Sequence, residues 1–536
     1  MRNLIYIRIM NKKILILTVA AGMALTSCDD FLDKMPDNRT EINTAEKVTK
    51  LLVSAYAESN VNYLCEMASD NTMDNGANYT IGERQQQEAY LWEKITGNGN
   101  DSPLSFWNNT YLAIASANQA LASIEEMGGH ETMKAQRGEA LLCRAWAHFC
   151  LANFFCQAYA PQTADQNLGL PYATEPETTV KPEYTRGTLA ELYANIEKDI
   201  EEGLPLIDNN LYTVQKYHFN TNAAYAFATR FYLYYQKWDK AIECANKVLG
   251  NTPGKVMRDW KTIYAMAADF TSRCNEFVST KSAANFLLQT ATSQMPFWIG
   301  PYNIGTRYGH NATYICNIET YRASGLWGAY GTSSDLYMAN SCWGIEQKIC
   351  YTKYRQDMQY VDKVNGIGYP MVVTVPLTGP ETLLCRAEAY VHTKQYDKAV
   401  ADINTWMEYN CRTKFDIVIE DIEAIYGDME YSEDAEGNPL PASQYSTPKK
   451  RLNPAGFTVE DETEESLYHC LLHMRRCEMI MDGMRWQDIK RFGIEIAHNR
   501  AGTTPDILRK DDLRRAFQLP DDVISAGLEA NPRNDN

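Results

Sequence analysis

The sequence predicts a mainly α-helical fold: a tetratricopeptide-like superhelix of paired helices with an inserted, aromatic, loop-rich lobe that contains short strands. Three observations predict it. Apolar residues recur with helical periodicity over most of the chain. Residues 236–241 (QKWDKA) and 394–399 (KQYDKA) nearly repeat each other, which is typical of helical repeats. Between residues 253 and 376 the helical periodicity is lost.

The N-terminal segment has the pattern of a lipoprotein signal. Lys12 and Lys13 precede an apolar run over residues 14–24, and small residues then lead to Cys28. This order is typical of a secretory signal, and a cysteine after the small residues is the bacterial lipobox. We expect residues 1–27 to be removed and Cys28 to carry diacylglycerol and a further acyl chain such as palmitate. Residues 28–43 would then form the tether between the lipid and the folded protein. An ordinary signal is the alternative, and translation can begin at Met1 or Met10.

Helical patterns follow in order. Residues 44–59 and 107–127 each predict an amphipathic helix, and residues 137–159 predict a third, rich in alanine and aromatic residues. Residues 188–204 predict a fourth, in which Thr188 and Glu191 have capping-box spacing. Residues 220–249 and 380–407 each predict a helix pair with small residues at the crossing and an aromatic residue closing the turn. The scaffold is therefore expected in two parts, residues 44–252 and 377–536.

Charge and cysteine content restrict the classes of partner. The net charge is −17, and loss of the four basic residues within 1–27 lowers it to about −21. Such acidity argues against nucleic acid and polyanionic ligands. No later run approaches the roughly 20 apolar residues of a membrane span. Thirteen cysteines remain besides Cys28, without a CxxC pair. We favour buried free thiols, with disulfides as the alternative.

The C-terminal run 475–493 resembles the signature ER-x-x-EF-x-x-EG-x-RW-x-DL-x-R-x-G of SusD/RagB-type outer-membrane lipoproteins. The matching residues are Arg475, Glu478, Gly483, Arg485, Trp486, Asp488, Arg491 and Gly493. Met474, Met479 and Asp482 depart from it, where the family has Glu, Phe and Glu. Further stretches match in order over the mature chain: residues 28–33, 107–118, 138–145, 169–172, 383–390 and 519–532.

The resemblance implies a non-catalytic nutrient-binding lipoprotein on the outer face of the outer membrane. Such a protein sits as a lid on a SusC-like, TonB-dependent transporter barrel and captures glycans, or in some members peptides. We therefore expect oligosaccharide binding for this chain. An oligopeptide-binding member of the family is the first alternative, and a surface glycosidase is the second.

The signature has catalytic-looking residues, but we interpret it as a buried ion-pair lattice. We expect Gly483 to end a helix in the left-handed conformation and Arg485 to pair with Asp488 on one helix face. His469 and His473 have the spacing of two metal ligands, but Cys470 replaces the glutamate of HExxH. Ile81 stands where an EF-hand beginning at Asp70 needs glutamate. No cofactor is therefore predicted, although an irregular structural calcium site stays open.

The candidate ligand residues are aromatic or polar. Ten aromatic residues lie between Phe297 and Trp343, interleaved with glycine. Sugars present C–H faces that stack on such rings, and we select Trp298, Trp327 and Tyr330. In the SusD/RagB family the platform also draws on the segment before the W-x-x-x-Y helix. Here that ligand loop, residues 68–106, contains Tyr79, Arg84, Trp92 and Asn98. We expect the inserted lobe, residues 253–376, and this loop to form the site.

Overall fold

The computed structural model describes residues 42–177, 183–301, 305–328, 334–340, 342–345, 347–444, 447–500 and 502–533. The chain divides into residues 1–44 and a unit of residues 45–536, which holds every helix and strand named below. Cys28, the predicted signal and the tether up to residue 41 lie outside the described residues.

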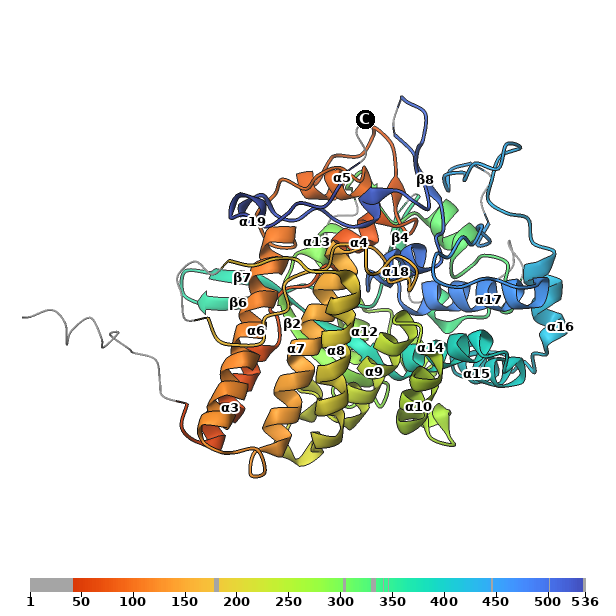
Figure 1. Ribbon diagram of the computed structural model, residues 1–536. Helices are drawn as coiled ribbons and strands as arrows, with labels where there is room; N and C mark the ends of the chain where they lie inside the picture. The colour runs from red at the N-terminus through yellow and green to blue at the C-terminus, as the bar shows by residue number, and fades with distance from the viewer. Residues whose placement is uncertain are drawn as a thin grey trace, which may run out of the picture. The chain divides into compact units, whose positions relative to one another are not determined.

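The longer helices form a scaffold in which successive helices pack side by side (Figure 1). They are α3 (Ala45–Leu52), α6 (Pro103–Glu126), α7 (Lys134–Phe155), α8 (Leu189–Gly203), α9 (Thr221–Tyr234), α10 (Trp238–Leu249), α14 (Gly379–His392), α15 (Tyr396–Asn410), α17 (Glu462–Glu478) and α18 (Met484–Arg491). Helix α7 contacts α6 and α8, α10 contacts α9 and α14, and α14 contacts α15 and α17. The predicted α-rich scaffold is confirmed.

The two repeated segments occupy equivalent turns. Gln236 lies between α9 and α10, Lys394 lies between α14 and α15, and both have left-handed backbones with φ of 62° and 58°. Helix α10 contacts α14 directly, so the two pairs stack although residues 253–376 separate them in sequence. Ala224 and Ala387, which stand in the first helix of each pair, are fully buried, as close helix packing requires.

Several predicted helix boundaries differ from the structure, and the helix expected over residues 137–159 is α7, Lys134–Phe155. The helix expected over residues 44–59 ends at Leu52, and the 3-10 turn η1 (Val53–Ala55) follows. The chain leaves the helix because the Tyr56 hydroxyl donates to Glu139 (2.7 Å) and accepts from the Phe219 N–H (2.6 Å). Helix α6 starts four residues before Trp107, since Ser102 caps it and Pro103 opens it. The Thr188–Glu191 capping box of α8 is present as predicted.

The inserted segment carries the strands that were expected and several short helices that were not. Strands β2 (Asn285–Thr292), β7 (Ile367–Thr378) and β6 (Asp357–Asp362) form an antiparallel sheet with β7 in the centre. Strand β7 runs directly into α14, whose N-cap is Thr378, so the sheet is joined to the scaffold without a linker. The short helices of this segment are α11 (Trp260–Ala265), α12 (Phe270–Phe277), α13 (Met295–Trp298) and the π-helix η7 (Ala312–Glu319).

Three two-stranded ladders complete the sheet structure, all antiparallel. They pair β1 (Met73–Asp74) with β3 (Tyr308–Gly309), β4 (Cys342–Ile345) with β5 (Lys348–Tyr351), and β8 (Ile496–His498) with β9 (Asp506–Leu508). The remaining short helices are α4 (Asn62–Ala68), α5 (Arg84–Tyr90), α16 (Ile419–Ile422), α19 (Asp521–Ser525), η2 (Leu204–Leu206), η3 (Asn209–Leu211), η4 (Gln215–Tyr217), η5 (Pro253–Val256), η8 (Tyr337–Asn340), η9 (Glu423–Gly427) and η10 (Leu513–Arg515).

Most of the described cysteines and the pair His469 and His473 are packed in the protein interior. The twelve cysteines whose side chains the structure describes are free, and all but the half-buried Cys150 are buried. His473 is buried, with Nδ1 3.0 Å from the Tyr426 hydroxyl and Nε2 3.1 Å from the Thr320 carbonyl oxygen. No described helix is long and apolar enough to cross a membrane.

Candidate ligand-binding site

The ligand loop and the inserted lobe meet at the β1–β3 ladder. Met73 pairs with Gly309 and Asp74 with Tyr308. Backbone hydrogen bonds continue beyond the ladder. The Thr80 N–H donates to the Gly305 carbonyl oxygen (3.2 Å), and the Thr80 carbonyl oxygen accepts from the Arg307 N–H (2.7 Å). Two segments more than two hundred residues apart are thus held together by backbone hydrogen bonds, and side chains from both face the same region.

Trp298 is the central aromatic residue of this region. It ends α13, is half-buried, and lines a small cavity together with Thr306, His310 and Lys348. Gly82 of the ligand loop packs directly on it, since a Cβ atom at Gly82 would lie 2.9 Å from Trp298 Cζ3. The indole Nε1–H of Trp298 is buried and has no acceptor among the described residues. A buried donor without a protein partner leaves a hydrogen bond for a ligand or water to complete.

Lys348 lines the same cavity as Trp298 and also contacts Tyr79 of the ligand loop. Tyr79 is half-buried, and the Lys348 ammonium lies 5.3 Å from the centroid of its ring, within the range of a cation–π contact. Lys348 Nζ also donates to the carbonyl oxygen and hydroxyl of Thr306. Burial disfavours the charged amine and lowers the pKa of Lys348 to about 8. Lys348 therefore ties β5 to Thr306, which lines the same cavity as Trp298.

Arg307 adds an ion pair that the sequence alone did not point to. Its guanidinium makes two parallel hydrogen bonds to Asp74, of 2.7 and 2.6 Å, which link β1 to the residue before β3. The pair raises the pKa of Arg307, chiefly through the hydrogen bond to Asp74. Lys348, Thr306 and Arg307 were missed because only strand pairing brings them to the ligand loop, and none of them belongs to a motif.

Arg84 and Asn98 lie at the surface. The Arg84 side chain is 77% exposed at the start of α5 and pairs with Glu88 at 2.7 Å. Asn98 is exposed in the loop that follows α5 and makes no hydrogen bond to another described residue. Arg84 lies two residues after Gly82, which packs on Trp298, so Arg84 is close in sequence to the residues around Trp298. The structure does not bring Asn98 into contact with Trp298 or Tyr79.

Two of the selected tryptophans pack in the core instead. Trp327 is 1% exposed and lies against Trp406 and His473, with ring centroids 5.9 and 4.5 Å apart. Trp92 is 7% exposed, stacks on His498 at 4.3 Å, and donates its indole N–H to Ala68 (2.8 Å). Covered rings cannot stack on a sugar in this conformation, so neither is kept in the candidate site. Tyr330 lies outside the described residues.

The signature residues form a buried ion-pair network. Arg475 Nε and Nη2 each donate to Asp488 at 3.0 Å, and Arg491 bridges Asp488 (2.8 Å) and Glu388 (2.5 Å). The Trp406 indole N–H donates to Glu478 (3.1 Å), and Trp486 is fully buried. The positive charges of Arg491 and Arg475 hold the pKa of Glu388 well below its usual range, against the opposing effect of burial.

Two details expected for the signature are wrong. Arg485 does not pair with Asp488; both ends of its guanidinium bind Asp70, at 2.7 and 2.8 Å, because Asp488 is already occupied by two arginines. Gly483 is left-handed as predicted (φ 70°), but it precedes α18 as its N-cap residue instead of directly ending α17. Four residues separate the end of α17 at Glu478 from Gly483, and among them Met481 is also left-handed (φ 67°).

Comparisons with known proteins agree with this architecture. Residues 30–233 match a family model, SusD-like, described as starch-binding and associating with the outer membrane. A solved SusD superfamily protein from Bacteroides thetaiotaomicron is 16% identical, with a TM-score of 0.59 over 91% of this chain and 99% of its own. One from Bacteroides fragilis is 18% identical (TM-score 0.55; 91% and 99%). A SusD-like carbohydrate binding protein from Bacteroides vulgatus is 15% identical (TM-score 0.57; 90% and 95%).

No curated protein matches the chain. The solved structures share the fold at low identity, while the family model matches the N-terminal part of the sequence itself. The family model supports the resemblance that the C-terminal signature carries, and the solved structures show that this chain has the fold of SusD superfamily proteins.

Proposed function

We propose that this protein is a non-catalytic lipoprotein of the cell surface that binds an oligosaccharide and delivers it to a TonB-dependent transporter in the outer membrane. The family suggests glycan binding, since its model is described as starch-binding and associating with the outer membrane. The finer parts of the proposal are the ligand site, the lipid anchor and the partner barrel.

The observation that carries the binding proposal is that Trp298 of the inserted lobe and Tyr79 of the ligand loop both lie beside Lys348. A sugar offers C–H groups on its ring faces and hydroxyls at its edge. The indole face of Trp298 suits the first, and its unpartnered Nε1–H suits the second. Tyr79 is fixed beside it by Lys348, which limits the conformational entropy lost when a ligand binds.

A binding role also fits the charged residues elsewhere. The acids and arginines of the signature, which resemble an acid–base set by composition, are buried and engaged with one another. Glycoside hydrolysis needs two carboxyl groups facing one bond from opposite sides in a cleft. Asp488 of the signature and Glu388 of the adjacent helix α14 are each 1% exposed and face arginines, so they support structure in the scaffold.

The binding proposal is tested by truncating Trp298. Trp298→Ala in the mature domain is expected to weaken binding of malto-oligosaccharides by roughly 1 to 3 kcal/mol, a scale taken from aromatic stacking on planar ligands. Its melting temperature should change little, since the ring is only half-buried. Titration calorimetry and a melting curve measure the two effects.

Trp327→Ala is the matched control. Because Trp327 is fully packed, its truncation should lower stability by about 3 to 5 kcal/mol, and at temperatures where it stays folded it should bind as the wild type does. Trp298→Phe, which keeps a ring but loses the N–H, should retain part of the affinity. If calorimetry showed binding heat with peptides and none with any glycan, the protein would be an oligopeptide binder instead. Release of reducing sugar during incubation with a glycan would show that it is a glycosidase.

A further inference from the structure

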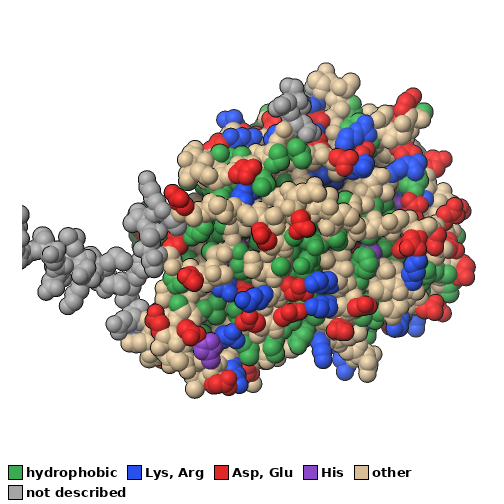
Figure 2. All heavy atoms as spheres, in the orientation of Figure 1, with side chains coloured by type: hydrophobic (Ala, Val, Ile, Leu, Met, Phe, Trp, Pro, Cys, Tyr) green, Lys and Arg blue, Asp and Glu red, His purple; other side chains and the backbone are tan. Residues whose placement is uncertain are grey.

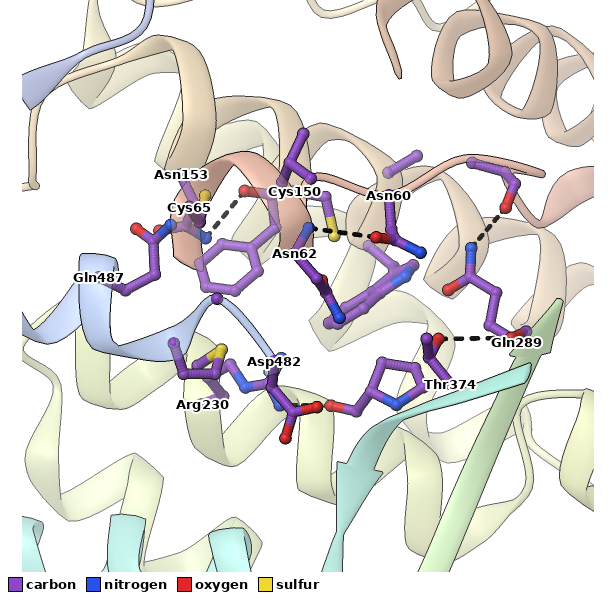
Figure 3. A pocket seen from close by; sticks show the side chains of 18 of the residues that line it. Asn60, Asn62, Cys65, Cys150, Asn153, Arg230, Gln289, Thr374, Asp482 and Gln487 are labelled. Carbon is purple, nitrogen blue, oxygen red and sulfur yellow. Dashed lines mark hydrogen bonds between the residues drawn. The ribbon is translucent and has the colours of Figure 1, made fainter. Parts of the chain in front are cut away.

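A second cavity lies inside the scaffold, apart from the Trp298 region. It has a volume of about 120 Å³ and is enclosed by α6, α7, α9, the β2–β7 strands and residues 479–487 (Figure 3). It shares no lining residue with the small cavity beside Trp298. The apolar part of its wall includes Phe106, Trp146 and Phe149. Part of the family signature, Asp482 to Gln487, therefore forms one wall of a hollow space in the core.

Polar side chains in this wall lack partners. The hydroxyls of Ser59, Thr110 and Tyr234 and the Nδ2 amide group of Asn60 are buried, and none hydrogen-bonds to a described residue. Ser59, Thr110 and Tyr234 are each more than nine-tenths buried. Buried polar groups are nearly always hydrogen-bonded in native proteins, because leaving them dry is unfavourable. Four such groups around one cavity indicate an occupant that supplies acceptor atoms.

The charges at the cavity are already matched within the protein. Arg230 is held by both oxygens of Glu381. Asp482 accepts from Lys353 (2.5 Å) and from the Tyr354 hydroxyl (2.6 Å). A charged ligand would find no free counter-charge among these lining residues and would lose its hydration, which is unfavourable in a buried site. The occupant is therefore expected to be uncharged.

We infer that this cavity binds a small neutral organic molecule with an acceptor oxygen on a short aliphatic body. The free groups are three hydroxyls and an amide NH₂, all able to donate, which suits a carbonyl or hydroxyl oxygen. The aromatic wall suits the apolar part. A volume of about 120 Å³ is well above the roughly 10 to 15 Å³ that a cavity needs to hold one water molecule, so there is room for a small organic molecule such as a four-carbon amide or alcohol. Asn60 and Asn62 are only half-buried, so their loop is the thinnest wall and the expected entrance.

The test uses butyramide as the neutral probe and butyrate as its charged analogue, titrated into the mature protein by calorimetry. Butyramide should bind and butyrate should bind at least about tenfold more weakly. Thr110→Val and Tyr234→Phe each remove one free hydroxyl while keeping the shape, and should weaken butyramide by about three- to tenfold. Ala147→Leu places a larger side chain in the wall and should abolish binding.

Thr229→Val is the matched control, because the buried Thr229 hydroxyl donates to the Tyr225 carbonyl (2.7 Å) and does not line the cavity. It should leave butyramide affinity unchanged. The inference is overturned if butyramide does not bind, or if its affinity is the same in Thr110→Val and Tyr234→Phe as in the wild type. A crystal structure in which butyramide fails to displace ordered water from the cavity would also overturn it. Should Ala147→Leu not fold, the two isosteric variants still decide.

Discussion

Asp70 joins parts of the chain that lie far apart in sequence. It stands between α4 and β1, yet its carboxylate accepts two hydrogen bonds from Arg485 in α18 and its carbonyl oxygen accepts one from Arg476 in α17. Arg476 also forms an ion pair with Glu319 of the inserted π-helix (2.6 Å), and Lys450 pairs with the same carboxylate. All of these side chains are buried. Single charges therefore connect the ligand loop, the inserted lobe and the C-terminal helices.

The first prediction concerns Asp70→Asn and its dependence on pH. Arg476 and Arg485 outweigh burial and hold the pKa of Asp70 well below its usual range. The folded protein therefore stays ionised at Asp70 where the unfolded chain takes up a proton, so this contribution is present above about pH 4 and is lost as the pH falls further. Asp70→Asn should lower the free energy of unfolding by about 3 to 5 kcal/mol at pH 7, and by less at pH 3.

Denaturant unfolding at the two pH values measures the difference. The exposed Asp397 provides a control, since Asp397→Asn should change stability by no more than about 0.5 kcal/mol. If the gap between wild type and Asp70→Asn were equal at pH 7 and pH 3, the ion pair would not be the source of the stability.

At the scale of elements, the turns of the two helix repeats share a left-handed residue at the same position. Gln236 and Lys394 are left-handed, a conformation that is unfavourable for residues with a Cβ atom. In both turns the following helix begins two residues later, with Trp238 and Tyr396. The similarity of the sequences thus reflects a similar turn geometry, and both positions have a backbone conformation that glycine adopts readily.

Lys394→Gly is accordingly expected to raise the melting temperature slightly, because relief of the left-handed strain exceeds the extra entropy of glycine in the unfolded chain. Lys398→Gly, four residues on and inside α15, should instead be destabilising by about 1 kcal/mol. Both lysines are exposed, so thermal melting of the two variants compares backbone effects. A lower melting temperature for Lys394→Gly would mean that its surface contact with Glu460 matters more than the strain.

At the scale of the molecule, the helical scaffold carries a charged surface beside the sheltered ligand region. Lys237 and Lys240 pair with Glu197 of α8, and Lys240 also pairs with Glu201. Basic and acidic side chains are interspersed over the face shown in Figure 2. Mixed surface charge of this kind favours solubility and contributes little stability. In the proposed function, Cys28 provides attachment to the membrane, and protein–protein contact provides attachment to the transporter.

The last prediction tests both attachments together. With a tag after Asn536, the wild-type protein should be found in the membrane fraction, and in mild detergent a barrel of on the order of 100 kDa should copurify. Cys28→Ala should fold normally but move to the soluble fraction in cells that lack the barrel, since two or more acyl chains are needed for stable anchoring. Cell fractionation and mass spectrometry of the eluate provide the readout.

Membrane retention of Cys28→Ala in those cells would show that the lipobox interpretation is mistaken. If no barrel copurified from wild-type membranes, the proposal that the protein delivers its ligand to a transporter would be wrong. Glycan binding would still be tested separately by Trp298→Ala. The two parts therefore fail separately.

The fold class and the repeats follow from the sequence because they depend on local periodicity. Apolar spacing predicted α7 and α8, the Thr188 capping box marked the start of α8, and the paired segments at Gln236 and Lys394 marked equivalent turns. The boundary at Leu52 did not follow, because Tyr56 is drawn away by Glu139, a residue of another helix. Local patterns determine which elements form, and distant partners set where they end.

The candidate site was only partly open to prediction. Composition pointed to the aromatic residues of the inserted segment, and the family resemblance added the ligand loop; Trp298 and Tyr79 do lie beside Lys348. Composition could not separate Trp298 from Trp327, because both stand among glycines and burial depends on what packs against them: Trp406 and His473 cover Trp327. Likewise Arg485 pairs with Asp70 and not with its helical neighbour Asp488, since only the tertiary structure decides which carboxylate an arginine meets.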